Sequence, residues 1–139
     1  MATLTPPPWA YTLQLPHDPR APGVARAALR AVLDRHGMGE LAVTAELLAS
    51  ELVTNAQVHT SGPYALRIGQ RPQGRLRVGV WDADPEVPPP FEGVAVVPGG
   101  ARETGRGLLL VRDCADRFGW YPLGGPGKYL WAECGGGSS

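Results

Sequence analysis

The stretch Glu51-Leu52-Val53-Thr54-Asn55-Ala56-Gln57-Val58-His59 places polar residues at regular intervals in an otherwise apolar run. Positions four apart lie one above another on a helix, so Glu51, Asn55 and His59 form a single stripe. Glu51 and Asn55 lie between two apolar arcs, Leu47 and Val58 on one side and Leu41, Leu48 and Leu52 on the other. A carboxylate and an amide in such a strip are costly to desolvate without a binding partner. The pattern therefore predicts a helix over residues 41–58 that carries part of a ligand site.

Length and composition favour one soluble domain of 139 residues. Thirteen basic and thirteen acidic residues cancel, which argues against a nucleic-acid or anionic-membrane surface. No apolar run reaches the length of a membrane span, and residues 1–6 lack the features of a signal peptide. Cys114 and Cys134 are too few for a disulfide framework, so we expect two reduced thiols. These features predict a cytoplasmic protein.

The remaining elements alternate along the chain. Apolar periodicity and turn residues predict strands at 11–15, 64–69, 76–82 and on either side of 124–127, and helices at 18–35 and 107–117. In the first of these helices Asp18 suits the N-cap and Pro19 the first helical position. Its predicted buried side consists of Val24, Ala27, Ala28, Ala31 and Val32. The order of elements predicts an α+β fold, a two-layer sandwich of a mostly antiparallel sheet with helices on one face.

Composition divides the chain into one domain with flanking segments. Residues 1–10 form a flexible, proline-rich lead-in, residues 11–134 the single domain, and residues 135–139 a flexible tail. Within the domain, residues 86–103 contain four prolines and three glycines, too many for a long helix or a central strand. We expect this segment to be a mobile lid.

A second polar residue in an apolar row, which we call a polar intrusion like the helix stripe, lies at the end of a predicted strand. Leu76, Val78 and Val80 alternate with polar or small residues, and Asp82 shares their side of the strand. An alternative without a functional role is that the strand has ended and Asp82 begins a turn with Pro85. The helix stripe favours the first interpretation, because both intrusions would then face the space between helices and sheet.

The third feature is a pair of glycines in Thr104-Gly105-Arg106-Gly107-Leu108, at the start of an apolar helix. Helix N-termini present unpaired N–H groups and the positive end of the dipole, and glycines let a phosphate come close to them. Such glycines also serve as ordinary loop hinges. The chain has no G-x-x-x-x-G-K-[ST] run, so a nucleotide site here is not a P-loop.

Taken in order, these segments resemble the GHKL (Bergerat-fold) ATPase superfamily, in particular its branch of small anti-sigma-factor serine kinases and histidine-kinase-like ATPases. The E-L-V-x-N-A pattern of residues 51–56 matches the N box, and residues 80–85 are similar to the first nucleotide box. Residues 105–108 are similar to the second box, and Gly127-Lys128 before residues 129–131 to the closing turn and strand. The resemblance extends over nearly the whole chain.

The resemblance implies a role for each matched residue. Asn55 would ligate Mg²⁺, for which an amide oxygen is a suitable hard ligand, and Asp82 would accept a hydrogen bond from the adenine amino group. Glu51 would be the general base that takes a proton from an attacking hydroxyl. The remaining nucleotide contacts would come from His59, Gly105, Arg106, Gly107, Leu108 and Lys128. For His59 a helix-end cap, and for Arg106 a solvated loop position, remain equal alternatives.

The implied function is an ATP- and Mg²⁺-dependent regulator that sequesters a sigma factor and acts as a serine protein kinase on a small anti-sigma-factor antagonist. A homodimer is compatible with this branch. The nearest alternative is an ATP-binding switch of the same fold without phosphotransfer. A histidine kinase is disfavoured because only one helix precedes the N-box helix, and a pure interaction domain would require the Glu51–Asn55 strip to be satisfied internally. Two departures from the family pattern are Asp84, where the first box has glycine, and Tyr129, where a small hydroxyl residue is common.

Overall fold

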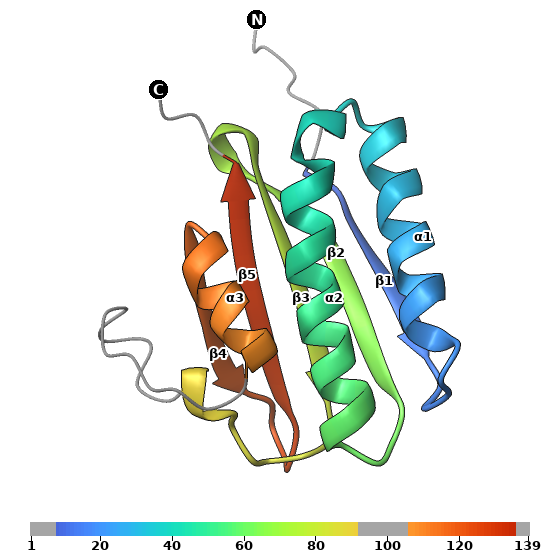
Figure 1. Ribbon diagram of the computed structural model, residues 1–139, viewed down its shortest axis with the longest axis vertical. Helices are drawn as coiled ribbons and strands as arrows, with labels where there is room; N and C mark the ends of the chain where they lie inside the picture. The colour runs from blue at the N-terminus through green and yellow to red at the C-terminus, as the bar shows by residue number, and fades with distance from the viewer. Residues whose placement is uncertain (1–7, 92–105, 136–139) are drawn as a thin grey trace, which may run out of the picture.

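The computed structural model describes residues 8–91 and 106–135, which form two layers. One layer is a five-stranded sheet in the order β1-β2-β3-β5-β4, with every neighbouring pair antiparallel. Its strands are β1 Ala10–Leu15, β2 Tyr64–Arg71, β3 Arg75–Asp82, β4 Arg117–Pro122 and β5 Lys128–Gly135. The helices α1 Ala21–Arg35, α2 Ala42–His59 and α3 Arg106–Cys114 cover one face of the sheet (Figure 1). The predicted two-layer α+β sandwich is confirmed.

Helix α2 occupies the centre of the helix layer and contacts α1, α3 and β3. Its buried side includes Leu48, Leu52 and Val53 together with three alanines, whose small side chains let neighbouring backbones approach closely. The carboxyl end of α2, the carboxyl end of β3 and the start of α3 all lie at the lower end of the molecule in Figure 1. The fold therefore brings the three predicted site segments to one end of the sheet.

Strand β3 shows the alternation that the sequence predicts. Leu76, Val78 and Val80 are buried against the helix layer at 1 % exposure or less, and Asp82 continues that row at 5 %. The strand includes Asp82, so the row of inward side chains ends on a carboxylate. The alternative interpretation, in which the strand ends before Asp82, is wrong.

Helix α1 differs from its prediction in start and in phase. It begins at Ala21, with Arg20 as N-cap, because the Asp18 carboxylate accepts the Arg20 N–H (2.8 Å) and closes a turn before the helix. The buried positions are Ala21, Ala25, Leu29 and Leu33 rather than the predicted set, and Val24 is 53 % exposed. A spacing of four residues places Leu29 and Leu33 against the core. The many alanines of this helix concealed that phase, because they give little difference in hydrophobicity between its faces.

Part of the predicted lid is described. Residues 86–91 lead into a short 3₁₀ helix, Pro89–Phe91, and the Phe91 ring is fully buried with its centroid 5.5 Å from that of Phe118. The rest of the predicted lid, with Gly105, lies outside the described residues, as do residues 1–7 and 136–139. The two thiols are free as predicted, Cys114 exposed and Cys134 buried. Across the two described ranges, no helix has the length and apolarity required to cross a membrane.

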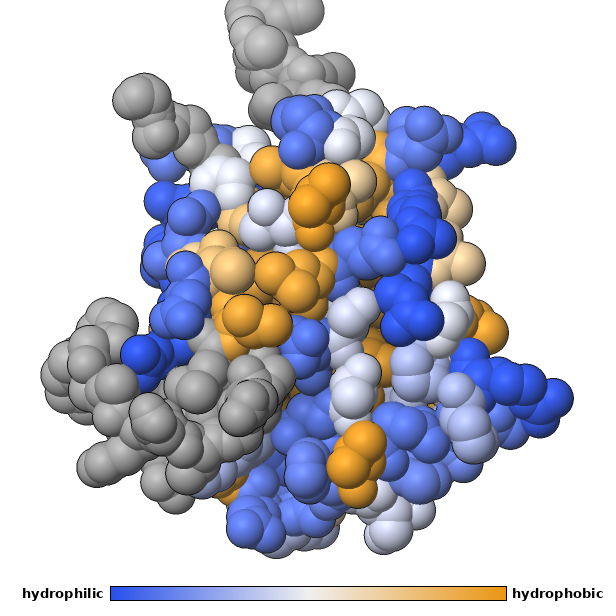
Figure 2. All heavy atoms as spheres, viewed as in Figure 1, coloured by the Kyte–Doolittle hydropathy of each residue, from blue (hydrophilic) through white to orange (hydrophobic). Residues whose placement is uncertain are grey.

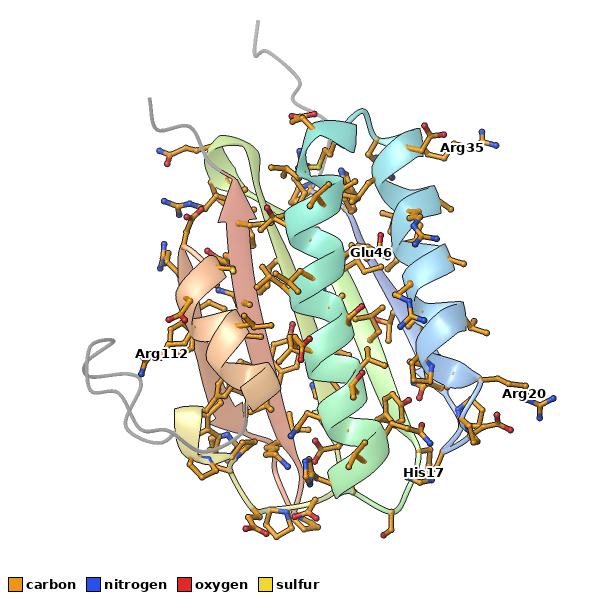
Figure 3. All side chains as sticks on the ribbon, in the orientation of Figure 1. His17, Arg20, Arg35, Glu46 and Arg112 are labelled. Atoms are coloured by element: carbon orange, nitrogen blue, oxygen red, sulfur yellow. The ribbon has the colours of Figure 1, made fainter. Side chains whose placement is uncertain are left out.

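The outer surface of the helix layer is mostly hydrophilic, with apolar atoms exposed above α2 and α3 (Figure 2). Exposed apolar residues on these helices include Val43 (84 %) and Leu110 (42 %). Between α1 and α2, the Arg30 guanidinium donates two hydrogen bonds to the Glu46 carboxylate, which lies on the side of α2 facing α1 (Figure 3). This exposed pair links the two helices.

Candidate functional site

The inward row of β3 ends on a buried ion pair. Lys128 opens β5 directly opposite Asp82 in the strand register, and its Nζ donates to Asp82 Oδ1 at 2.7 Å. The same ammonium donates to the carbonyl oxygen of Asp84, also at 2.7 Å, and the Asp84 N–H donates to Asp82 Oδ1 at 2.9 Å. One oxygen of the Asp82 carboxylate is therefore fixed by two donors.

The second oxygen of that carboxylate has no such partner. Asp82 Oδ2 is buried, and no hydrogen-bond donor within the described residues reaches it. A buried polar atom without a partner costs free energy, more so when it carries charge. The site thus offers a fixed, negatively charged acceptor at the end of an apolar row. An exocyclic amino group, as in adenine, is a donor of the required kind.

Helix α2 supplies the second part of the site. Glu51 and Asn55 are half-buried, and buried Leu52 lies between them in sequence. Neither the Glu51 carboxylate nor the Asn55 amide makes a side-chain hydrogen bond to another residue of the described segments. As far as residues 8–91 and 106–135 are concerned, both groups keep their hydrogen-bonding capacity for a ligand, and the strip is not satisfied internally by these residues.

The carboxyl end of α2 is held by residues that the sequence analysis did not select. The Thr60 hydroxyl donates to the carbonyl of Ala56 (2.6 Å), so Thr60 rather than His59 satisfies a terminal carbonyl of the helix. His17 Nε2 lies 2.8 Å from the Gln57 carbonyl oxygen, beside the lower end of α2 in Figure 3. The His59 side chain is exposed at this same end. In the sequence, the signal for these contacts was the group of hydroxyl and amide residues around the end of α2.

The remaining predicted contacts fall into two groups. Arg106, Gly107 and Leu108 form the first turn of α3, at the same end of the molecule as Asp82, whereas Gly105 lies outside the described residues. Lys128 points into the interior, and its ammonium is engaged by Asp82 and Asp84. The nucleotide contact of Lys128 stays a prediction, and what the structure adds is that its ammonium holds Asp82 in place.

Both departures from the family pattern have a local structural explanation. The Asp84 carboxylate accepts the Glu86 N–H at 2.9 Å and closes a turn after β3. Tyr129 lies on the opposite face of the sheet from the helices, since it pairs with Trp81 in the register and a Cβ at Gly79 would overlap its ring. The Tyr129 phenol is therefore separated by the sheet from the space that Asp82 faces.

Glycine at position 127 lets the β4–β5 turn come close to the end of β3. A Cβ at Gly127 would lie 2.6 Å from the Asp82 carbonyl oxygen, which would displace the strand end. A hollow of about 530 Å³ borders Asp82 and Gly127 at this end of the sheet. Its lining includes Ala65 and Trp81, which face away from the helices, and no residue of α2, so this hollow is not the space that the Asp82 carboxylate faces.

Comparison with known proteins identifies the family. The model of the histidine kinase-like ATPase domain matches residues 15–132, from the end of β1 into β5. The chain belongs to the histidine kinase-like ATPase domain family. The matched region contains α2, β3, the start of α3 and Lys128, so all the candidate site residues lie within the family's domain. Membership of an ATPase family implies that the nucleotide is ATP.

Individual proteins similar to this chain include one relative by sequence and one by fold. An uncharacterized protein of Streptomyces coelicolor, SCO4941, is 46 % identical over 57 residues, or 41 % of this chain. That alignment spans about half (51 %) of the Streptomyces protein. A chain in the crystal structure of the SiaB–SiaC complex from Pseudomonas aeruginosa has the same fold, with a TM-score of 0.71 over 89 % of this chain and 88 % of that chain. Its sequence identity is 14 %, so the likeness concerns the fold alone.

Proposed function

We propose that this chain is an ATP-binding regulatory protein that acts as an anti-sigma factor and as a serine protein kinase on an anti-sigma-factor antagonist. The observation that carries the nucleotide part is Asp82 Oδ2, a buried acceptor that lacks a donor within the described residues. Family membership supports ATP as the ligand that supplies this donor.

Adenine recognition follows from the chemistry of the ion pair. Paired with the Lys128 ammonium, the Asp82 carboxylate is an acceptor and not a donor. Its free oxygen suits the amino group of adenine and opposes the carbonyl oxygen that guanine carries at the same position. Asp82 would therefore select adenine over guanine.

The phosphates would extend from Asp82 toward α2 and the first turn of α3. Asn55 would supply an amide oxygen to Mg²⁺, and the backbone N–H groups at the start of α3 would face the phosphates. His59 and Arg106 would add positive or hydrogen-bonding groups at the same end. The metal ion would neutralise charge on the phosphate oxygens during transfer.

Glu51 is the proposed general base. It lies one turn before Asn55 on α2, and its carboxylate is free of other described side chains. In the proposed step, Glu51 accepts the proton of a serine hydroxyl while the serine oxygen bonds to the γ-phosphorus. The bond from the γ-phosphorus to the bridging oxygen breaks, and ADP leaves with that oxygen. Positioned bases of this kind contribute about 10²- to 10⁴-fold to rates.

The regulatory part of the proposal rests on the comparison with a known complex and on the resemblance of the sequence motifs. The SiaB–SiaC complex shows that a protein of this fold occurs in a complex with another protein, which supports a protein partner for this chain. The resemblance of the three nucleotide boxes to those of anti-sigma-factor kinases supports an antagonist and a sigma factor as partners. Cytoplasmic location and a homodimer belong to the same proposal.

One observation favours a second candidate, an ATP-binding switch without phosphotransfer. The only lysine of the chain is Lys128, and its ammonium is buried against Asp82 instead of being available to a phosphate. Catalytic phosphoryl transfer depends on positive charge around the transferred group. A site with less positive charge would bind ATP but transfer its γ-phosphate slowly.

Phosphate transfer from labelled ATP to antagonist proteins encoded near this one distinguishes the two candidates. Glu51→Gln keeps the side-chain shape, so ATP affinity should stay within about twofold while transfer falls by about 10²-fold or more. Glu46→Gln is the matched control, because it changes a carboxylate on the same helix that pairs with Arg30. Full-rate transfer by Glu51→Gln would refute the general base, and tight ATP binding without transfer by the wild type would favour the switch.

A further inference from the structure

The sheet face opposite the helices concentrates positive charge. Strand alternation and register place five arginines and one carboxylate on it: Arg67, Arg71, Arg75, Arg77, Arg117 and Glu133. Five guanidinium charges and one carboxylate charge leave an excess of four positive charges on the strands of this face. The whole chain is neutral, with thirteen basic and thirteen acidic residues. The excess is therefore a local property of the fold that the composition conceals.

A hollow of about 430 Å³ opens in this face. Its lining includes Arg67, Arg71, Arg77, Trp81, Tyr121 and Tyr129. The hollow exists because Ala10 and Gly69, which face each other across β1 and β2, contribute little side-chain bulk. This volume falls in the range of small-molecule sites in proteins, about 300–1,000 Å³.

The arginines of the hollow are only partly neutralised. Glu133, which is buried, accepts a hydrogen bond from Arg77 at 2.7 Å, and Arg71 Nε lies 3.4 Å from the same carboxylate oxygen. Arg67 has no carboxylate partner within the described residues; its guanidinium lies 5.9 Å from the centroid of the Trp81 ring and 3.4 Å from Thr12 Oγ1. Arg117 Nε also lies 3.8 Å from Glu133 Oε1, so Arg71, Arg77 and Arg117 share one carboxylate. Arg67 is therefore available to an anion.

The aromatic rings form walls instead of an open stacking surface. Tyr129 is 2 % exposed, and the Arg77 guanidinium covers the Trp131 ring at 3.9 Å. A platform for successive bases of single-stranded nucleic acid needs exposed ring faces. A half-open hollow with exposed Tyr121 in its lining instead suits one small, flat group.

We propose that this hollow is a binding site for a small organic anion that carries a phosphate or carboxylate group on a flat ring. The forked guanidinium groups of Arg67 and Arg71 supply paired donors to the oxyanion. Trp81 and Tyr121 contact the ring. The hollow lies across the sheet from the inward face of Asp82, so this site is separate from the nucleotide site and does not depend on the proposed function.

Phenyl phosphate, benzoate, inorganic phosphate and phenol are the probes, titrated calorimetrically at low salt. The phosphate and carboxylate arms distinguish the two oxyanions. We expect at least one ring-bearing anion to bind about tenfold more tightly than inorganic phosphate, because only it fills the aromatic part of the hollow. Phenol, without the charge, should not bind. Absence of binding by both phenyl phosphate and benzoate at millimolar concentration would overturn the proposal.

Three variants separate a built site from a diffuse charge effect. Arg67→Gln should weaken binding of the better probe by about tenfold, since a charge-assisted contact is lost. Ala10→Leu should weaken it comparably by filling the hollow at constant charge. Arg75→Gln is the matched control, because Arg75 shares the face but does not line the hollow, and it should keep affinity within about twofold. Equal weakening by Arg75→Gln and Arg67→Gln would contradict a specific site.

Discussion

Asp82 and Lys128 face each other across β3 and β5 as a buried ion pair, with Nζ 2.7 Å from Oδ1 and side chains at 1 % and 3 % exposure. Removing a charge from water is costly, and the cost is offset only when the partner and further hydrogen bonds are in place. Here the Asp84 carbonyl and N–H complete the arrangement on one side. Oδ2, which has no donor among the residues that the structure describes, is therefore held in position by a network that does not itself use it.

We expect either charge of this pair to be costly when left alone. Asp82→Asn and Lys128→Met should each lower the free energy of unfolding by about 3 kcal/mol, because the remaining charge is buried without its partner. The double variant should recover much of this loss. Urea denaturation of the four proteins measures the coupling, and Arg30→Gln, which breaks an exposed pair, should cost much less than either single variant. A loss of that small size for Lys128→Met would refute the stabilising pair.

Lys128 should also affect nucleotide selectivity. Without the ammonium, Asp82 Oδ1 loses one of its two donors, so the carboxylate holds Oδ2 less firmly in the position that accepts the adenine amino group. The preference of Lys128→Met for ATP over GTP should therefore shrink by about tenfold, measured by competition binding on the folded variant. A fall in affinity that is equal for both nucleotides would contradict this explanation and leave Lys128 with a structural role only.

Stability should decline at alkaline pH. Burial raises the pKa of the Cys134 thiol from 9.0 to about 11 and the pKa of the Tyr129 phenol from 10.0 to about 12. Because each pKa is higher in the folded protein, the stabilisation is complete below the unfolded value and is lost as pH rises through the folded one. The free energy of unfolding should fall between pH 9 and 12. Tyr129→Phe should make the fall above pH 10 shallower by about 2 kcal/mol in total, and an unchanged slope would contradict the assignment.

The sequence predicted α2 and β3 well because both have strong periodicity. A polar stripe four residues apart and an alternating row ending at Asp82 each permit one orientation against a core. The phase of α1 could not be derived in the same way, because alanines on all sides leave little contrast between its faces. Leu29 and Leu33 carried the signal that the prediction missed.

The candidate site residues could be selected from the sequence one by one, and their roles stay predictions, but their arrangement could not be derived. The Asp82–Lys128 pair depends on β5 lying between β3 and β4, so that strands far apart in the chain become neighbours. No local pattern specifies that order. The basic sheet face was hidden for a related reason, since a net charge of zero says nothing about how the charges divide between the two faces of the sheet.

The central claim is that Asp82 receives the adenine of an ATP–Mg²⁺ complex whose metal ion Asn55 ligates. Isothermal titration calorimetry of ATP with and without Mg²⁺, on the wild type, Asp82→Asn and Asn55→Ala, tests it most directly. We predict binding by the wild type that strengthens with Mg²⁺, weaker binding with a reduced preference over GTP in Asp82→Asn, and loss of the Mg²⁺ effect in Asn55→Ala. No heat of binding from the folded wild type at millimolar ATP–Mg²⁺ would contradict the claim.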